Sequence, residues 1–274
     1  MLGKEVRMKR IINPVTGKTL IIPIDHGMSD GPIKGLVNVG ETIERIDSAG
    51  VNSIIMHKGL VPSSIGRMKN AGLLVHLSAG TMLAPDPLNK VIVTTVEEAV
   101  ALGADGISIH MNVGAESTPK MMEDVGKISR DCKRFGMPLL MMMYPRGEKV
   151  ADETNVEFVK IAARIGAELG ADIVKTNYTG STDSFREVVE GCPVPVIIAG
   201  GSKGTDKEVL EMIKSAMDAG AAGVAMGRNS FQHASPKKFL KSASLIIHNN
   251  MSVKEAMKGA GLDERVDSRC AAIQ

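Results

Sequence analysis

The chain has 274 residues, 43% of them hydrophobic, which is enough to bury one large core as a single α/β barrel or to form two smaller domains. Its 33 basic and 31 acidic side chains leave a formal net charge of +2, which gives no reason to expect nucleic acid or an anionic membrane surface as a partner. No tract approaches the roughly 20 apolar residues of a membrane span, and the N-terminus lacks the hydrophobic core of a signal peptide, so a cytoplasmic protein is expected.

After a basic and exposed first turn or two, eight short apolar runs alternate with helical patterns along the chain. Continuous apolar runs are typical of strands in a parallel sheet that is buried on both faces. The strands are predicted at 19–25, 51–57, 73–78, 105–111, 138–144, 171–176, 194–199 and 221–226. The helices are predicted at 41–49, 62–70, 95–102, 119–135, 155–170, 181–190 and 205–219, with further helices to about residue 261.

Two segments have a more specific pattern. The connection 79–90 contains Gly80, Pro85 and Pro87 and is expected to resist helix formation. In the predicted helix 155–170, apolar residues recur at the spacing of one helical face and are expected to pack on the core. They are Phe158, Ile161, Ala162, Ile165 and Leu169.

Eight strand–helix units are the number found in a (β/α)8 barrel. A doubly wound open sheet is the alternative, but no GxGxxG motif follows the first strand. We therefore predict an α/β fold, with a single-domain (β/α)8 TIM barrel at residues 19–261. An N-terminal lead-in segment at 1–18 precedes it, and a C-terminal tail at 262–274 follows it.

Residues at the carboxyl ends of barrel strands meet at one mouth, where active sites lie. Lys175 is at such an end, closing the buried strand 171–176. A dry pocket favours the neutral amine of a lysine, and a neutral amine can attack a carbonyl. The alternative is a lysine whose charge reaches out of the strand end into water.

Tyr144 and Asp25 end two other strands and complete a set suited to Schiff-base chemistry. Tyr144 is the candidate proton donor and Asp25 the candidate proton acceptor for carbon–carbon bond cleavage. Each has an ordinary alternative, as a tyrosine at the edge of the core and as a turn aspartate before Gly27. Arg146 is expected to hold Asp25 ionised or to bind an anion, unless it is a surface arginine.

Glycine motifs follow the seventh and eighth strands, as Gly200-Gly201 and Gly227-Arg228. Phosphate sites in such barrels are commonly built at these two strand ends, from backbone N–H groups that approach the phosphate where no Cβ intervenes. The two motifs together predict a phosphorylated substrate.

No metal ion or other cofactor is expected. His26, His57, His76 and His110 lie in or beside strands, but none has the close spacing of metal ligands. His26 and His57 are candidates to orient polar groups of the substrate, and Lys58 is a candidate partner for a phosphate or carboxylate. The cysteines are too few and too widely spaced for a disulfide framework or a zinc cluster; they are Cys132, Cys192 and Cys270.

These residues lie in motifs that resemble one known family, the DeoC/FbaB-like, archaeal class I aldolase group. The resemblance extends in order along the chain to about residue 259. It rests on IPIDHGMSDGPIKG (22–35), MHKG (56–59), VTTVEEA (93–99), MMYPRG (142–147), GAELGADIVKTNYTG (166–180), AGG (199–201) and GVAMGRNSFQH (223–233).

The resemblance implies a Schiff-base transaldolase on a (β/α)8 barrel. Such an enzyme joins L-aspartate semialdehyde to a fragment of a phosphorylated ketose, 6-deoxy-5-ketofructose 1-phosphate. The product is 2-amino-3,7-dideoxy-D-threo-hept-6-ulosonate, on an archaeal route to 3-dehydroquinate and the aromatic amino acids. The alternatives are a class I fructose-bisphosphate aldolase and, from another class, a non-catalytic phosphosugar-binding barrel.

By the same resemblance, Lys175 is the Schiff-base lysine, Tyr144 the proton donor and Asp25 the proton acceptor. The implied substrate contacts are Asp25, His26, Gly27, Met28, Ser29, Tyr144, Pro145, Arg146, Gly200, Gly201, Gly227 and Arg228. The family also implies a homo-oligomer, such as a decamer. Two features depart from it: Ser202 stands where a proline is expected, and the tail 262–274 has no counterpart.

Overall fold

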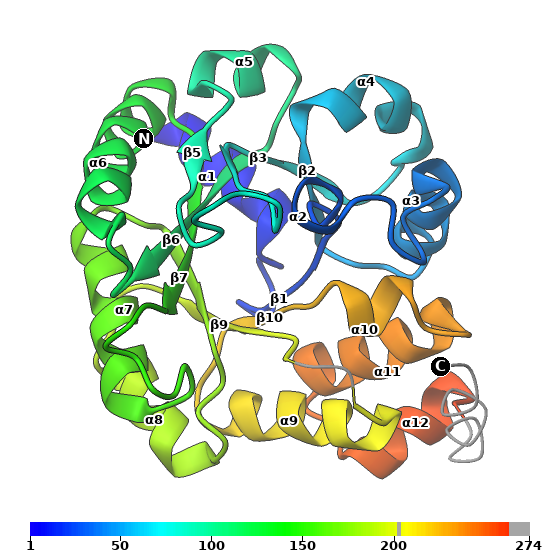
Figure 1. Ribbon diagram of the computed structural model, residues 1–274. Coiled ribbons are helices and arrows are strands. Elements are labelled where there is room, and N and C mark those ends of the chain that lie inside the picture. The colour runs from blue at the N-terminus through cyan, green and yellow to red at the C-terminus, as the bar shows by residue number, and fades with distance from the viewer. Residues whose placement is uncertain (202–203, 263–274) are drawn as a thin grey trace.

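The computed structural model of the chain describes residues 1–201 and 204–262. Eight parallel strands close into a barrel in the order β1-β10-β9-β8-β7-β6-β3-β2, and helices surround it (Figure 1). The predicted (β/α)8 barrel is therefore confirmed, with a strand in each predicted range. The barrel strands are β1 (Thr19–Pro23), β2 (Ser53–His57), β3 (Gly72–His76), β6 (Gly106–Val113), β7 (Leu139–Pro145), β8 (Ile173–Thr176), β9 (Val196–Ala199) and β10 (Gly223–Ala225).

The helices begin and end close to the predicted positions where sequence signals are clear. Thr95 and Thr205, for example, each form a capping box with a glutamate three residues later, which starts α5 and α9. The longer helices are α1 (Leu2–Ile11), α3 (Val39–Asp47), α5 (Val96–Ala101), α6 (Thr118–Phe135), α7 (Val156–Glu168), α8 (Thr182–Glu190), α9 (Asp206–Asp218), α11 (Pro236–Asn249) and α12 (Val253–Ala260).

Some connections contain short elements that were not predicted. The segment expected to form one helix at 62–70 is instead two short helical turns that end at Arg67, with Pro62 at the start of the first one. The connection 79–90 is not helical, as expected, and a two-stranded antiparallel sheet flanks it. These elements are α2 (Gly27–Asp30), η1 (Lys58–Leu60), α4 (Val61–Ser64), η2 (Ile65–Arg67), β4 (Ser78–Ala79), β5 (Val91–Ile92) and α10 (Arg228–Phe231).

The N-terminal segment is more than an exposed turn. Helix α1 lies across the amino-terminal end of the barrel (Figure 1), where Ile11 is fully buried among the residues that fill the barrel. Lys4 Nζ lies 2.9 Å from Asp172 Oδ2, and Arg10 Nε lies 2.7 Å from Asp105 Oδ1. The helix thus closes the end of the barrel opposite the carboxyl ends of the strands.

The predicted core face of helix 155–170 is only partly right, because Ala162 is buried and Ile165 and Leu169 pack against the core. The buried residues of α7 are Val159, Ala162, Ala163 and Gly166, whereas Ile161 is 53% exposed. Helix α7 lies so close to the barrel at Gly166 that an added Cβ would be only 2.8 Å from Met143 Cγ. Small residues therefore lie nearest the barrel, and Ile165 and Leu169 pack beside them and border an outer groove together with Ile161.

Among the described residues, no helix is both long enough and apolar enough to cross a membrane. Within the same part of the chain, no group of three or more His, Cys, Asp or Glu side chains could hold a metal ion.

Candidate active site

A cavity of about 710 Å³ opens at the carboxyl ends of the barrel strands. Nine of the twelve predicted substrate contacts line it together with Lys175, although they come from separate parts of the sequence. The predicted residues that line the cavity are Asp25, His26, Ser29, Tyr144, Arg146, Lys175, Gly200, Gly201, Gly227 and Arg228. Gly27, Met28 and Pro145 are not among the lining residues, and Met28 is 43% exposed.

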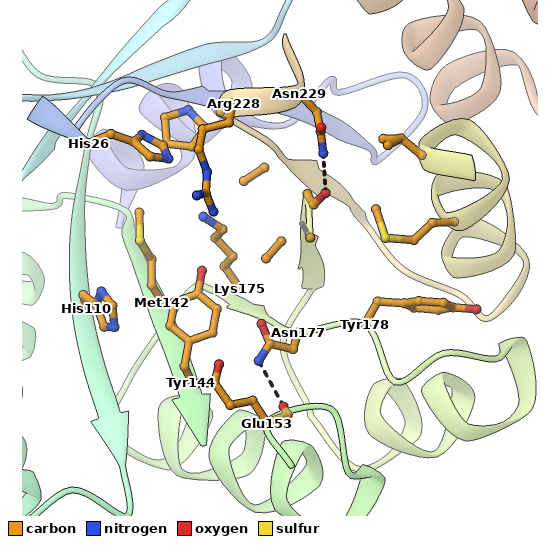
Figure 2. Close-up of a pocket in the computed structure, with 18 of the residues that line it drawn as sticks. His26, His110, Met142, Tyr144, Glu153, Lys175, Asn177, Tyr178, Arg228 and Asn229 are labelled. Atoms are coloured by element: carbon orange, nitrogen blue, oxygen red, sulfur yellow. Dashed lines mark hydrogen bonds between the residues drawn. The ribbon is translucent and has the colours of Figure 1, made fainter. Parts of the chain in front are cut away.

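Lys175 is buried in the wall of the cavity. It lies in β8, paired with Met142 of β7 on one side and Ile197 of β9 on the other, and is only 6% exposed. Figure 2 shows its amine end directed towards Arg228, with the Tyr144 hydroxyl pointing into the same space. The Nζ atom lies 5.9 Å from the centre of the Tyr144 ring. The candidate nucleophile and proton donor therefore face one volume.

Asp25 follows β1 and lies among histidines. Its Oδ2 is 3.9 Å from His76 Nε2, and its Oδ1 is 3.5 Å from His26 Nδ1. Burial raises the pKa of Asp25, but the neighbouring His76, His26, Lys175 and His57 together hold that pKa below its usual value. Asp25 is therefore a carboxylate at neutral pH, as a proton acceptor must be.

Arg146 does not have the role expected for it beside Asp25. Its Nε lies 2.8 Å from Glu153 Oε2, and its guanidinium lies 4.7 Å from the centre of the Tyr144 ring. The groups that lower the pKa of Asp25 are the histidines and Lys175. The prediction that Arg146 holds Asp25 ionised is thus wrong, whereas its place in the cavity is confirmed.

A buried polar network lies behind Asp25. His76 Nδ1 is 2.7 Å from Ser108 Oγ, and its Nε2 is 3.3 Å from Ser78 Oγ. Burial lowers the pKa of His76 to about 4, so its ring is neutral at pH 7 and carries one N–H. Ser108 was not identified from the sequence, although it alternates with His110 and Asn112 on the inner face of β6.

The same face of β6 supports the proton donor. His110 Nε2 donates to Asn112 Oδ1 at 2.8 Å, and Asn112 Nδ2 donates to the Leu88 carbonyl at 2.6 Å. The His110 ring packs edge-on against Tyr144, with 5.0 Å between ring centres. Burial lowers the pKa of His110 well below its usual value, so it too is neutral. Tyr144 is thereby held between His110 and Arg146.

The glycines after β9 and β10 allow close backbone packing. A Cβ on Gly227 would lie 2.3 Å from His26 Cε1, and a Cβ on Gly200 would lie 2.4 Å from Met226 Cβ. Asn229 Nδ2 donates to the Gly200 carbonyl at 2.8 Å and so joins the two loops (Figure 2). Asn229 was missed by sequence reasoning, although it directly follows Gly227-Arg228. Ser202, where the family pattern is broken, lies outside the described residues.

Two predicted residues lie elsewhere, and several unpredicted ones join the cavity. His57 is buried against His76, with 5.1 Å between ring centres, and does not line the cavity. Lys58 is not among the lining residues either, and its Nζ lies 2.9 Å from Glu98 Oε1, so the carboxylate that it contacts is one of the protein's own. The unpredicted lining residues include Met142, Glu153, Asn177 and Tyr178.

The chain is similar in sequence to several synthases of seven-carbon amino acids. It is 46% identical to 2-amino-3,7-dideoxy-D-threo-hept-6-ulosonate synthase 1 of Archaeoglobus fulgidus, over 95% of this chain and 97% of the relative. It is 41% identical to the enzyme of that name from Halobacterium salinarum, over 95% and 97%. It is 37% identical to 2-amino-4,5-dihydroxy-6-oxo-7-(phosphonooxy)heptanoate synthase of Streptomyces griseus, over 94% and 95%.

The fold is similar to those of solved class I aldolases. A Schiff base-forming fructose-1,6-bisphosphate aldolase has a TM-score of 0.84 at 32% identity, covering 89% of this chain and 99% of that one. An archaeal fructose-1,6-bisphosphate aldolase, solved with its catalytic lysine bound to the carbinolamine intermediate, has a TM-score of 0.83 at 33% identity over 90% and 99%. The family model for DeoC/LacD family aldolase matches residues 19–233. The predicted class I aldolase on a TIM barrel is confirmed, and the chain belongs to the DeoC/LacD family of aldolases.

Proposed function

We propose that this protein is a transaldolase that forms 2-amino-3,7-dideoxy-D-threo-hept-6-ulosonate. Its substrates are L-aspartate semialdehyde and 6-deoxy-5-ketofructose 1-phosphate. The observation that carries the proposal is the convergence of Lys175, Tyr144 and Asp25 in one cavity beside the glycine loops of β9 and β10. The relatives from Archaeoglobus fulgidus and Halobacterium salinarum, which are named for this product, support the choice of substrates.

The first half of the reaction cleaves the ketose. The Lys175 amine attacks the C5 ketone, and Tyr144 protonates the departing hydroxyl so that water leaves and an iminium forms. Asp25 then takes the proton of the C3 hydroxyl as the C3–C4 bond breaks. The electrons of that bond pass to C4 and form an enamine on Lys175, while C1–C3 leave as a phosphorylated three-carbon ketoaldehyde.

The second half builds the product. The enamine carbon attacks the aldehyde carbon of L-aspartate semialdehyde, and the new alkoxide takes the proton held by Asp25. Water then adds to the iminium and releases the seven-carbon product, which leaves Lys175 as a free amine. The lowered pKa of Asp25 suits the first half, in which the group must be ionised to take a proton.

The glycine loops are proposed to bind the phosphate of the ketose. At Gly200 and Gly227 an added Cβ would collide with neighbouring atoms, so only glycine leaves the backbone in this arrangement. Arg228 lines the same side of the cavity and supplies a positive charge for the phosphate. His26 and Ser29, from the loop after β1, are the nearest proposed contacts for the sugar hydroxyls and carbonyls.

A class I fructose-bisphosphate aldolase is the second candidate, and the observation that favours it is the similarity to two solved aldolases of that activity. The two functions are separated by assaying the protein with each sugar and identifying the products by mass spectrometry. We expect a seven-carbon amino acid only from L-aspartate semialdehyde with 6-deoxy-5-ketofructose 1-phosphate. Efficient cleavage of fructose 1,6-bisphosphate without that product would instead establish the second candidate.

We also propose that the catalytic unit spans residues 19–261, with 1–18 as its lead-in segment, and that it works as a homo-oligomer. Support for assembly comes from the apolar groove beside α7, where Ile161 is 53% exposed. Light scattering coupled to size-exclusion chromatography measures the number of subunits directly. The tail at 262–274 lies outside the described residues, apart from Leu262.

A further inference from the structure

The proposed reaction brings two different molecules to one position in the cavity. The phosphorylated three-carbon fragment leaves from C4 of the ketose, and the acceptor aldehyde then bonds to the same carbon, which stays attached to Lys175 through C5. Asp25 serves the C3 oxygen when the first bond breaks and the aldehyde oxygen when the second bond forms. The acceptor must therefore extend to the side from which the fragment left, which is the side of the proposed phosphate loops after β9 and β10.

Arg228 supplies positive charge on that side. It lines the cavity at the start of α10, and Figure 2 shows its guanidinium end directed towards the Lys175 amine. Within residues 1–201 and 204–262, the guanidinium makes no hydrogen bond or ion pair with another residue. No carboxylate of the described chain therefore competes with an anionic ligand for this group.

Arg146, the other arginine that lines the cavity, is not placed to bind an anion there. Its Nε lies 2.8 Å from Glu153 Oε2, so a carboxylate of the protein already neutralises part of its charge. In the barrel, β8 stands between β7, which leads to Arg146, and β9, which leads to the first glycine loop. Figure 2 shows Glu153 and Arg228 on opposite sides of Lys175. An anion on the side of the phosphate loops therefore meets Arg228.

The anionic groups of the departing fragment and of the acceptor reach nearly the same point. The carboxyl carbon of L-aspartate semialdehyde lies one bond closer to its aldehyde carbon than the phosphorus does in the fragment. The backbone N–H groups of the glycine loops are fixed and cannot follow this difference. The side chain of an arginine is long and flexible, and its planar guanidinium binds a phosphate or a carboxylate through two parallel hydrogen bonds.

We propose that Arg228 binds the carboxylate of the acceptor aldehyde in the second half of the reaction, where it binds the phosphate of the ketose in the first half. This inference rests on the proposed function and adds the residue that recognises its acceptor. One guanidinium cannot hold both groups at this position, so the phosphorylated fragment must leave before the acceptor binds. The two half-reactions therefore alternate, without a complex that contains the fragment and the acceptor together.

Arg228→Gln tests the shared site, because it removes the charge and keeps part of the side-chain length. The acceptors compared are L-aspartate semialdehyde and 3-aminopropanal, which has the aldehyde and the amino group but no carboxylate. When two half-reactions alternate, kcat/KM for an acceptor reports on the second half alone, so weaker phosphate binding in the first half does not change it. We expect the variant to lose about tenfold or more in kcat/KM for L-aspartate semialdehyde, as for one charge-assisted pair, and to show no loss for 3-aminopropanal.

Arg146→Gln is the matched control, because it removes the other arginine of the cavity. The Arg146 guanidinium lies 4.7 Å from the centre of the Tyr144 ring, so an effect on proton transfer should reach both acceptors equally. We therefore expect this variant to keep the wild-type preference between the two acceptors. The same unchanged preference in Arg228→Gln would overturn the shared site and leave the proposed function standing. Absence of the seven-carbon product from the wild type would overturn the proposed function, and the shared site with it.

Inorganic phosphate gives a second readout that needs no variant. At saturating ketose, the shared site predicts that phosphate binds Arg228 in the enamine form of the protein and competes with L-aspartate semialdehyde, so that the KM of this acceptor rises while kcat stays the same. If the carboxylate were bound elsewhere, phosphate would compete only with the ketose, and saturating ketose would remove the inhibition. Loss of inhibition at saturating ketose would therefore overturn the proposal.

Discussion

Gly227 is where a single methyl group should disable the proposed phosphate site. A Cβ there would lie 2.3 Å from His26 Cε1 and 2.8 Å from the Pro23 carbonyl oxygen. Pro23 belongs to β1, whose backbone is paired with β2, so it cannot move away. The His26 ring or the loop after β10 must therefore shift by about 1 Å, and a misplacement of about 1 Å at an active site can lower the rate about 100-fold.

The variant Gly227→Ala is assayed by steady-state kinetics with the phosphorylated ketose and with its dephosphorylated form. We expect kcat/KM to fall about 100-fold for the phosphorylated donor and much less for the other. Urea denaturation should show a loss of about 1–3 kcal/mol in the free energy of unfolding, as for other overpacked sites. Gly59→Ala is the control, since a Cβ there meets no atom within 4 Å.

Two results would refute this reasoning. Activity within twofold of the wild type would show that the close approach at Gly227 is not needed. An equal loss with both donors would show that the glycine does not serve the phosphate.

Three further predictions concern Lys175, His76 and α7. Lys175→Met should abolish turnover while calorimetry still detects binding of the phosphosugar, because the proposed phosphate contacts are separate from the amine; loss of both in a folded protein would contradict this division. The pKa of His76 is about 4 in the folded protein and about 6.5 in the unfolded chain. At a pH between these two values, the ring is neutral in the folded protein and takes up a proton when the chain unfolds. Stability should therefore fall on acidification through that window by about 1.4 kcal/mol per pH unit from this residue, and His76→Gln should flatten the slope of unfolding free energy against pH; an unchanged slope would count against it. On α7, Ile161→Ser should change the unfolding free energy by less than about 0.5 kcal/mol and Val159→Ala should lower it by about 2 kcal/mol. The reverse order in urea denaturation would place Ile161 on the core face after all.

Much of the fold and the cavity could be predicted from the sequence because local patterns and topology agree. The strands of a barrel are buried on both faces, so each appears as a continuous apolar run. Polar residues directly after those runs, such as Asp25, Lys175 and Arg228, must then meet at one end. Because the barrel brings these strand ends together, the residues that line the cavity can be predicted without any knowledge of contacts.

Features that depend on packing could not be predicted in this way. The apolar spacing on α7 does not reveal that Gly166 brings the helix so close to Met143 that small residues must face the barrel. The partner of Arg146 is equally hidden, because Glu153 is seven residues away in a loop whose path no local pattern determines. The pairing of His76 with Ser108 depends on the register of β3 against β6.

The most direct test of the central claim is borohydride trapping followed by peptide mass spectrometry. The protein is incubated with 6-deoxy-5-ketofructose 1-phosphate, and separately with fructose 1,6-bisphosphate, before reduction. We predict a reduced adduct on the peptide that contains Lys175, with the first sugar preferred and no adduct in Lys175→Met. Absence of an adduct at Lys175 with either sugar would contradict the Schiff-base mechanism and leave a barrel that only binds phosphosugars.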